Sequence, residues 1–404
     1  MKHLPGLSFP ILISTQQSWD IEIDSTIKNL ASQFSAQNKV LFLNTPLDIK
    51  TFLRGSDNPS RRHKLSVLRK QQRPIREINR NLRVLDFPFV LFSINRIPFP
   101  WLFNILNYLN NFLIARYVKK TIKQLGWGKD FIVYSDTDIY RSFYLKELLR
   151  PKWFVYYKRD NVIIMDYWKF HGSRLEPQLM KKADQVIVNS GYFAGQAKQF
   201  NANTADVGTG VNLTEFDPEK SYTEPADLAV IPHPRIGYFG MILAIRLDMN
   251  LIDYLSENRP DYQFVFIGKE DEFFSSHPMK QRKNLWFLGH KSLETLPAYT
   301  YFLDVCINPQ IINEITIGNY PLKIDQYLAL GKPVVATRTH AMVQFFEEVC
   351  YLADSKESFA GFIDKAILEA PDPQKIKARI QLAQSHSWEK VAEKILQLLR
   401  ESLS

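Results

Sequence analysis

Runs of apolar residues bounded by turn residues alternate with amphipathic stretches along most of the chain. This alternation is typical of βα units, in which helices connect the buried strands of a parallel sheet. Helices are expected over residues 24–36 and 101–123. The strands expected in the first half are residues 10–15, 39–44, 83–87, 130–135, 153–157 and 185–190. The first half therefore predicts an α/β domain.

A second series of the same kind follows a polar, proline-bearing passage at residues 216–234. Its expected strands are residues 235–240, 263–268, 284–289, 303–309 and 332–337. The passage has the composition of an interdomain connection, and 404 residues suffice for two ordinary cores. We therefore predict an N-terminal domain over residues 1–215 and a C-terminal domain over residues 216–385.

The last segment, residues 386–404, predicts an amphipathic helix with Trp388, Val391 and Ile395 on one stripe. From the pattern alone, this helix packs either on its own domain or across onto the first one.

Cysteine usage and hydropathy narrow the class of protein. Cys306 and Cys350 both lie inside apolar runs, which argues against a disulfide framework and against a cysteine metal site, and fits a reducing cytosol. Pro5 and Pro10 interrupt the apolar N-terminal stretch, so we expect no signal peptide. Prolines and asparagines break the longest uncharged stretch, residues 97–115, so no transmembrane helix is expected either.

The net charge of +9 is concentrated between residues 51 and 83, where ten Lys and Arg face only Asp57 and Glu77. Residues 54–83 lack a consistent apolar period and predict a mobile loop. Together with the aromatic-rich residues 87–113 they form a basic and aromatic insertion at about 51–115. Such a segment suits attachment to an anionic membrane leaflet. The alternative is ordinary core with solvated arginines, and nucleic-acid binding is disfavoured because no recognised module accompanies the charge.

The most informative stretch for chemistry is residues 313–339. A polar loop with Gly318, Asn319 and Tyr320 precedes a short helix that starts near Pro321 and ends at Gly331. Amides at a helix start bind phosphates. Lys323, in the first turn, is unfavourable for the helix dipole unless an anion binds there. The alternative is a plain core-facing helix with Lys323 solvated.

Several segments together resemble the retaining GT-B glycosyltransferases of family 4, and within them the teichuronic-acid-biosynthesis-like bacterial polysaccharide enzymes. They occur in the family's order over about the last 230 residues. The segments are KKADQVIVNSGYF (181–193), VGTGVNLTEFDP (207–218), PRIGYFGMI (234–242), FVFIG (264–268), NLWFLG (284–289), PLKIDQYLALGKPVVAT (321–337) and the terminal SWEKV.

The resemblance implies two Rossmann-like domains facing a cleft and a C-terminal helix that crosses back to the first domain. It implies a UDP- or GDP-sugar donor and a polysaccharide or lipid-linked acceptor. No metal or other cofactor is expected, because helix dipoles, amides and basic side chains stabilise the leaving diphosphate. Transfer would be retaining, by front-face attack. The expected location is cytoplasmic, with peripheral contact to the inner membrane face through the Arg54–Arg83 region.

The resemblance also assigns residues to the donor. Asp160, Arg246 and Lys323 would be catalytic, with Arg246 and Lys323 neutralising the diphosphate. On the pattern alone, Arg246 is equally a solvated residue in the first turn of a helix, and Asp160 a capping or turn residue. The implied donor-binding residues are Gly240, Met241, Gly289, His290, Gly318, Asn319, Tyr320 and Gln326, with Gly289 and His290 near the nucleobase.

Two positions depart from the family pattern. Gln326 and Gly318 stand where relatives usually carry glutamates, and an amide binds a ribose hydroxyl without the charge that strengthens a carboxylate contact. The alternative function is therefore a GT-B-fold protein with reduced or lost catalysis that serves as a binding or scaffold subunit in polysaccharide assembly.

The acceptor side is expected in the first domain, because ligands of open α/β sheets bind at the carboxyl ends of the strands. The strands over 130–135 and 153–157 end near Asp136 and Asp160. Thr15 and Gln16 follow the first strand in a turn that lacks the family's glycines, and His171 is expected on a helix bordering the cleft.

Overall fold

The computed structural model describes residues 9–20, 25–55, 58–314 and 316–403. The chain divides into two compact units: unit 1 comprises residues 1–208 and 388–404, and unit 2 comprises residues 209–387. These limits fall within seven residues of the predicted domain limits at 215 and 385. Each unit has hydrophobic clusters of its own.

Unit 1 is built on a mainly parallel sheet with the strand order β10-β9-β8-β7-β1-β2-β5-β4. Only the edge strand β4 runs antiparallel. The strands are β1 (Ile11–Thr15), β2 (Val40–Leu43), β4 (Ile75–Glu77), β5 (Leu82–Leu85), β7 (Ile132–Asp136), β8 (Trp153–Lys158), β9 (Gln185–Val188) and β10 (Thr204–Asp206). A separate pair joins β3 (Leu47–Asp48) to β6 (Val90–Leu91). The central strands are fully buried, as their apolar runs predict.

Helices cover both faces of this sheet. One apolar cluster contains side chains of the helices α4 to α7, and the other contains side chains of α1 and α16. The helices are α1 (Thr26–Ser35), α2 (Ile49–Arg54), α3 (Pro59–Leu68), α4 (Pro100–Gln124), α5 (Leu145–Leu149), α6 (Asp166–Lys182), α7 (Gly191–Lys198) and α16 (Trp388–Leu403), with a 3-10 turn at Val162–Ile164.

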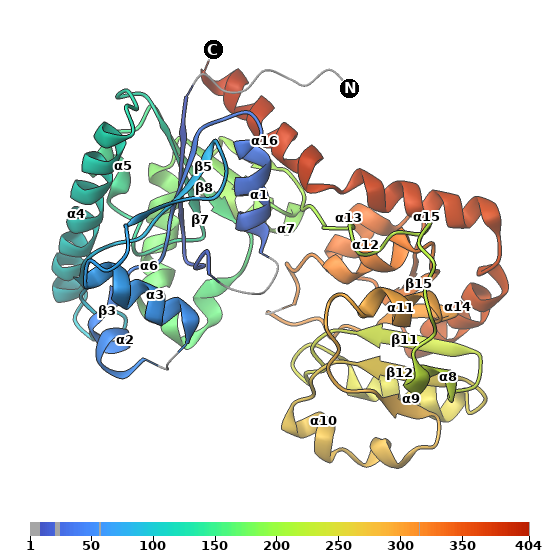
Figure 1. The fold of residues 1–404 in the computed structure, drawn as a ribbon. Coiled ribbons are helices and arrows are strands. Elements are labelled where there is room, and N and C mark those ends of the chain that lie inside the picture. Colours follow the sequence, from blue (N-terminus) through green and yellow to red (C-terminus); the bar gives the residue numbers. More distant parts are fainter. Residues whose placement is uncertain (1–8, 21–24, 56–57, 315, 404) are drawn as a thin grey trace. The chain divides into compact units, whose positions relative to one another are not determined.

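The last helix, α16, packs on unit 1 and not on the unit that precedes it in sequence. Trp388, Val391, Ile395 and Leu399 are buried in the same cluster as Leu30, and α16 lies beside α1 (Figure 1). The predicted return of the C-terminal helix to the first domain is confirmed.

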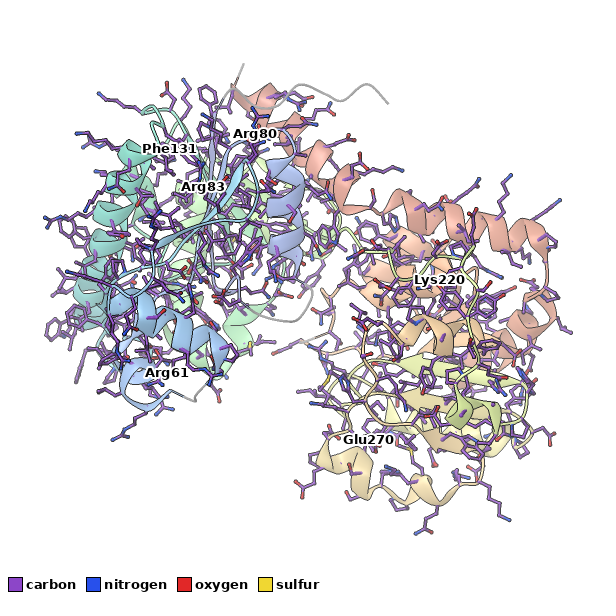
Figure 2. The ribbon with its side chains drawn as sticks, in the orientation of Figure 1. Arg61, Arg80, Arg83, Phe131, Lys220 and Glu270 are labelled. Atoms are coloured by element: carbon purple, nitrogen blue, oxygen red, sulfur yellow. The ribbon has the colours of Figure 1, made fainter. Side chains whose placement is uncertain are left out.

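The prediction of a mobile loop over residues 54–83 is wrong. This segment contains α3, β4 and β5. Polar contacts hold α3 in place, with His63 Nε2 3.0 Å from the Asp86 carboxylate and Lys64 Nζ donating to Thr45 at 2.6 Å. The basic residues do not gather in one patch either, because Arg61 lies near one end of unit 1 and Arg80 and Arg83 near the other (Figure 2).

Unit 2 is built on an all-parallel sheet with the order β13-β12-β11-β14-β15-β16. The strands are β11 (Arg235–Phe239), β12 (Gln263–Ile267), β13 (Leu285–Phe287), β14 (Val305–Asn308), β15 (Val334–Thr337) and β16 (Tyr351–Ala353). The helices are α8 (Ala226–Ala229), α9 (Met249–Asn258), α10 (Glu272–Ser276), α11 (Leu296–Tyr301), α12 (Leu322–Ala329), α13 (His340–Phe346), α14 (Lys356–Glu369) and α15 (Pro373–Ser385), with a 3-10 turn at Pro278–Gln281.

Both sheets have the order of a doubly wound dinucleotide-binding fold, in which the connections reverse direction beside the first strand. The reversal lies between β1 and β7 in unit 1 and between β11 and β14 in unit 2. Ligands of such sheets bind beyond the carboxyl ends of the strands at this reversal. Each unit therefore has one favoured position for a site. Within the described ranges, no helix is both long enough and apolar enough to cross a bilayer.

Candidate functional site

A cavity of about 280 Å³ opens in unit 2 where the sheet reverses. Its walls come from the ends of β11 and β14 and from the start of α12. Arg246, Asn319, Tyr320, Lys323 and Gln326, all expected to bind the donor, line it together with Gly240. The structure thus brings most of the predicted donor residues to one place.

Two glycines make the turn after β11 possible. Gly240 has a φ of +135°, and a Cβ there would lie 2.8 Å from the Lys323 ammonium nitrogen. A Cβ on Gly268, at φ +158°, would lie 1.7 Å from the carbonyl oxygen of Gly240. Side chains at either position would push this turn or the Lys323 ammonium away.

Backbone bonds join the two loops that flank the cavity. The amide of Ile311 donates to the Arg246 carbonyl at 3.0 Å, and the amide of Asp248 donates to the Pro309 carbonyl at 2.9 Å. The side chain of Asn313 donates to the Ile245 carbonyl at 2.8 Å. Residues 241–248 and 308–313 therefore form one connected wall.

Helix α12 begins after Pro321, and Gly331 follows its end at φ +70°, as predicted. The amides at its start are less open than expected, because those of Leu322 and Ile324 donate to the carbonyls of Tyr320 and Pro321. Gly318 is buried and does not line the cavity. The capacity to bind an anion therefore resides more in side chains than in amides.

Lys323 is the cation closest to the turn after β11. Its ammonium lies 3.8 Å from the ring centroid of Tyr238 and donates to the Tyr238 hydroxyl at 2.5 Å. Burial, together with the nearby charge of Arg246, lowers the pKa of Lys323 to about 7. The described residues offer Lys323 no carboxylate partner. A partly buried amine without a counter-ion is a favourable place for an anion to bind.

Arg246 is the second cation of the cavity. It lies in a turn before α9, whose N-cap is Asp248, so the interpretation as a first-turn helix residue is wrong. The guanidinium is exposed, and no ion pair involves it within the described part of the chain. Arg246 and Lys323 line the same cavity, and the charge of Arg246 contributes to the lowered pKa of Lys323.

A buried cluster holds Tyr320 at the cavity wall. The Tyr320 hydroxyl donates to the Asp325 carboxylate at 2.8 Å, and Nδ1 of His386 lies 2.7 Å from the other oxygen of that carboxylate. The Asp325 side chain is fully buried, and burial raises its pKa while His386 and Tyr320 lower it. The cluster joins α12 to His386, the C-cap residue of α15.

Besides Gly318, three predicted donor residues lie outside the cavity. Met241 is half exposed, and its carbonyl accepts a bond from the Tyr238 hydroxyl at 3.1 Å. Gly289 and the exposed His290 follow β13, two strands away from β11. Gly289 has a φ of +69°, and a Cβ there would meet nothing within 4 Å. The space beside Gly289 is therefore open.

In unit 1 the reversal of the sheet gathers the predicted acceptor-side residues. Thr15 and Asp136 are paired in register at the ends of β1 and β7, and the Thr15 hydroxyl donates to the Asp136 carboxylate at 2.8 Å. Arg159 donates to Asp136 and to Asp160, at 2.8 and 2.7 Å. Burial alone would lower the pKa of Arg159, but the two carboxylates raise it. Asp136 is buried, so the groups that remain open to a ligand are Arg159 and Asp160.

Gln16 and His171 are the two remaining residues predicted on the acceptor side, and the structure has them in different places. The Gln16 side-chain amide donates to the Thr137 carbonyl at the same strand ends. His171 is not part of this group: its ring stacks on Phe103 with centroids 3.7 Å apart, and its Nε2 lies 2.8 Å from the Ile97 carbonyl. Burial lowers the pKa of His171, and its environment is the packed contact between α4 and α6.

Two functional side chains were missed by sequence reasoning. Tyr238 supports the Lys323 ammonium, and Arg159 bridges two carboxylates. Arg159 directly precedes Asp160 in the sequence, and its position one residue after a buried strand was the available signal. Among the described residues, His, Cys, Asp and Glu side chains form no group of three suited to a metal ion.

Comparison with known proteins agrees with this geometry. Residues 233–369 match the family model described as glycosyl transferases group 1. The matched region contains the whole cavity. The chain therefore carries a glycosyl transferases group 1 domain.

A protein of Bacillus subtilis named as a teichuronic acid biosynthesis glycosyltransferase, TuaH, is 22% identical over 222 residues. The alignment covers 53% of this chain and 56% of the relative. The match thus spans little more than half the length of that relative.

Solved structures match nearly the whole chain. HepE from Anabaena in complex with UDP gives a TM-score of 0.65 at 16% identity and covers 97% of this chain and 100% of that one. Sucrose-phosphate synthase from Thermosynechococcus elongatus gives 0.64 at 15% identity, covering 97% and 98%. Trehalose-6-phosphate synthase from E. coli with UDP-2-fluoro glucose gives 0.64 at 10% identity, covering 98% and 99%. The fold is that of the GT-B glycosyltransferases.

Proposed function

We propose that this protein is a glycosyltransferase that moves a sugar from a UDP-sugar to a polysaccharide or lipid-linked glycan acceptor, without a metal ion. The observation that carries the proposal is the cavity at the reversal of unit 2, where Lys323 and Arg246 face one space without a carboxylate partner among the described residues. A diphosphate supplies the two negative charges that this pair lacks. That HepE was solved with UDP supports a uridine nucleotide as the donor carrier.

The chemistry asked of these side chains is stabilisation of the leaving group. As the bond between sugar and phosphate breaks, charge builds on the departing diphosphate, and fixed cations stabilise that state more than the bound donor. Gln326 and Asn319 line the same cavity and offer amides to the hydroxyls of the nucleotide. No side-chain nucleophile is required if attack and departure occur on the same face, which makes the proposed transfer retaining.

Unit 1 supplies the acceptor side of the proposal. Arg159 and Asp160 lie at the carboxyl ends of its strands and present a cation and a half-exposed carboxylate. Asp160 would orient an acceptor hydroxyl, and Arg159 would hold Asp160 in place. The proposed location is cytoplasmic, at the inner face of a membrane, where a lipid-linked acceptor is found.

The test is release of UDP from UDP-glucose and other UDP-sugars in EDTA, compared with the variants Arg246→Ala and Lys323→Ala. Each variant should lower kcat/KM by about a hundredfold, the cost typical of losing one transition-state donor. Lys365→Ala, which removes an exposed lysine on α14, is the matched control. Wild-type rates in both variants would remove the proposed diphosphate site.

Two further readouts address the finer parts of the proposal. NMR of the sugar released from an α-linked donor should show the α-anomer first if transfer is retaining. A thermal-shift panel of UDP, GDP and ADP should give its largest shift with UDP, because a ligand that prefers the folded state raises Tm. Failure of every nucleotide to bind, in wild type and in Gln326→Glu, would favour the scaffold function instead.

A further inference from the structure

The first half of α4 buries three asparagines beside Phe103, whereas most of its apolar side chains are exposed. The buried side chains include Asn107, Asn110 and Asn111. The exposed ones are Trp101, Ile105, Tyr108, Leu109 and Phe112, and the Trp101 side chain is 63% exposed. Amphipathic surface helices normally show the opposite arrangement. The packing of unit 1 therefore leaves this apolar face of α4 exposed to solvent.

Asn110 and Asn111 find hydrogen-bond partners inside the unit, so their burial on α4 has a structural basis. The side-chain amide of Asn110 donates to the Phe92 carbonyl and accepts from the Phe92 amide, at 3.0 and 2.9 Å. Asn111 donates to the Tyr140 carbonyl and accepts from the Tyr144 amide, at 2.9 and 3.1 Å. These bonds fix the rotation of α4 about its axis and with it the outward direction of the aromatic side chains.

Neighbouring segments extend the apolar surface around the start of α4. They are α2, the loop of residues 92–99 and the start of α6. Their exposed apolar side chains are Ile49, Phe52, Leu53, Phe92, Phe99, Met165, Tyr167 and Phe170. Leu53 and Phe170 are 68% and 61% exposed. Contiguous apolar surface of this kind marks an interaction site.

Hydrogen bonds hold these segments together as one surface. The Lys50 amide donates to the Ser93 hydroxyl at 2.9 Å, which ties α2 to the loop. Nε2 of His171 lies 2.8 Å from the Ile97 carbonyl, and Arg174 donates to the Asn104 side chain at 2.9 Å, which ties α6 to the loop and to α4. We call this surface, formed by the exposed apolar side chains of α2, residues 92–99, the first half of α4 and the start of α6, the apolar end.

The charges around the apolar end are mostly positive. Lys50, Arg54, Arg96 and Lys169 are exposed and form no ion pair with any described residue. Helix α4 contains no acidic residue, and its outward positions beyond Phe112 carry Arg116, Lys119, Lys120 and Lys123. The acidic residues of these segments are Asp166 and Asp48, and Asp48 caps α2.

This charge distribution indicates which kind of partner binds the apolar end. A second copy of the chain would bring lysines and arginines against their own kind, which is unfavourable. An anionic bilayer attracts them and accepts tryptophan, tyrosine and phenylalanine at its interface. The apolar end also adjoins the acceptor side of unit 1: Tyr140, four residues after Asp136, contacts the rings of Phe103 and Trp168, with centroids 5.1 and 4.4 Å apart.

We propose that unit 1 docks on an anionic lipid bilayer through the apolar end, with the basic second half of α4 against the lipid headgroups. The proposal of a docking surface rests only on the side chains of the apolar end and the charges around it. Its use in presenting a membrane-anchored acceptor to Arg159 and Asp160 rests on the proposed function.

The experiment is co-sedimentation of the full chain with vesicles of phosphatidylcholine containing 30% phosphatidylglycerol, and with vesicles of phosphatidylcholine alone. The wild-type protein should bind the anionic vesicles at least fivefold more tightly, and salt should weaken that binding. The double substitution Trp101→Ser with Phe112→Ser should weaken it at least fivefold again. Phe273→Ser, at a 72% exposed phenylalanine of unit 2, is the matched control and should bind like the wild type.

Melting curves confirm that the variants fold, and UDP binding is measured on the same samples. Equal sedimentation of wild type and double variant, or no binding to either vesicle, would overturn the docking surface while leaving the donor site standing. Vesicle binding without any nucleotide binding would overturn the proposed function and leave the surface standing. A double variant that changes oligomeric state but not vesicle binding would assign the apolar end to self-association and overturn the proposal.

Discussion

Lys323 shows how a single side chain links stability to ligand binding. Its pKa in the folded protein is about 7, against an ordinary value of 10.5. Between pH 7 and 10.5 the unfolded chain holds a proton on Lys323 that the folded protein lacks, so the stability of the fold rises with pH in this range. Below pH 7 Lys323 is charged in both states, and its charge destabilises the folded protein. Lys323→Met removes that cost. Its Tm at pH 7 should exceed that of the wild type by about 2–4 °C, and an unchanged or lower Tm in calorimetry would contradict the buried cation.

The same residue predicts how nucleotide binding depends on pH. A bound diphosphate restores the pKa of Lys323 toward its ordinary value, so binding takes up a proton above pH 7. The affinity for UDP should therefore fall as the pH rises from 7 to 9, by up to about tenfold per pH unit. Isothermal titration in buffers of different ionisation enthalpy measures this uptake. Lys323→Met should bind weakly and without that pH dependence, whereas a flat wild-type profile would separate Lys323 from the nucleotide.

Gly240 is predicted to be intolerant of a side chain. Gly240→Ala places a Cβ 2.8 Å from the Lys323 ammonium at a φ of +135°, so the ammonium must move and the turn is strained. UDP binding should weaken at least tenfold, as measured by thermal shift against nucleotide concentration. Gly195→Ala, in a helix of unit 1 with nothing within 4 Å of the new Cβ, is the control and should bind like the wild type.

At the residue scale, sequence reasoning found the side chains that follow buried strands and missed their partners. Thr15, Asp136 and Asp160 were expected at the carboxyl ends of parallel strands, and the structure has them there. Lys323 was expected in the first turn of a helix, and it lies in the first turn of α12. Their pairing was not predictable. Arg159 meets Asp136 across 23 positions, and Tyr238 meets Lys323 across 85 positions. Such contacts depend on the neighbouring strand and not on local periodicity.

At the scale of the element, α12 depends on a carboxylate that sequence reasoning left unassigned. Asp325 accepts hydrogen bonds from Tyr320 and pairs with His386, and its side chain is fully buried. Asp325→Ala would remove the buried carboxylate that Tyr320 and His386 share, at a cost of about 3 kcal/mol in the free energy of unfolding. Tyr320→Phe, which removes only the hydroxyl, should cost about 1 kcal/mol. Urea denaturation measures both free energies, and equal costs would show that Asp325 contributes no more than its hydrogen bond with the Tyr320 hydroxyl.

Helix α3 is a helix that the spacing of apolar residues does not predict. Of its ten residues only Val67 is buried, so the helix has no apolar stripe by which the sequence could predict it. The helix forms because Asn58 caps its start, Pro59 occupies the first turn, and His63 and Lys64 reach polar partners in unit 1. Elements with an apolar face, such as α1 and α16, were predictable for the opposite reason.

At the scale of the molecule, unit 1 is completed by α16 from the far end of the chain. Ile395→Asp would place a charge in a fully buried position of that unit and should cost about 4 kcal/mol or more. Hydrogen exchange should accelerate in β1 and β2 but not in β11 and β12. The exposed substitution Lys394→Asp on the same helix is the control, and equal protection in both variants would show that α16 contributes little to unit 1.

The discontinuity of unit 1 also dictates the order in which the protein is made. Unit 2 is one continuous stretch, so everything that it requires is translated before α16. Unit 1 begins first but must wait through the synthesis of residues 209–387, roughly ten to forty seconds at about 5–20 residues per second. During that interval the groove that later receives Trp388 and Ile395 stays uncovered, and a nascent-chain chaperone has its clearest target there.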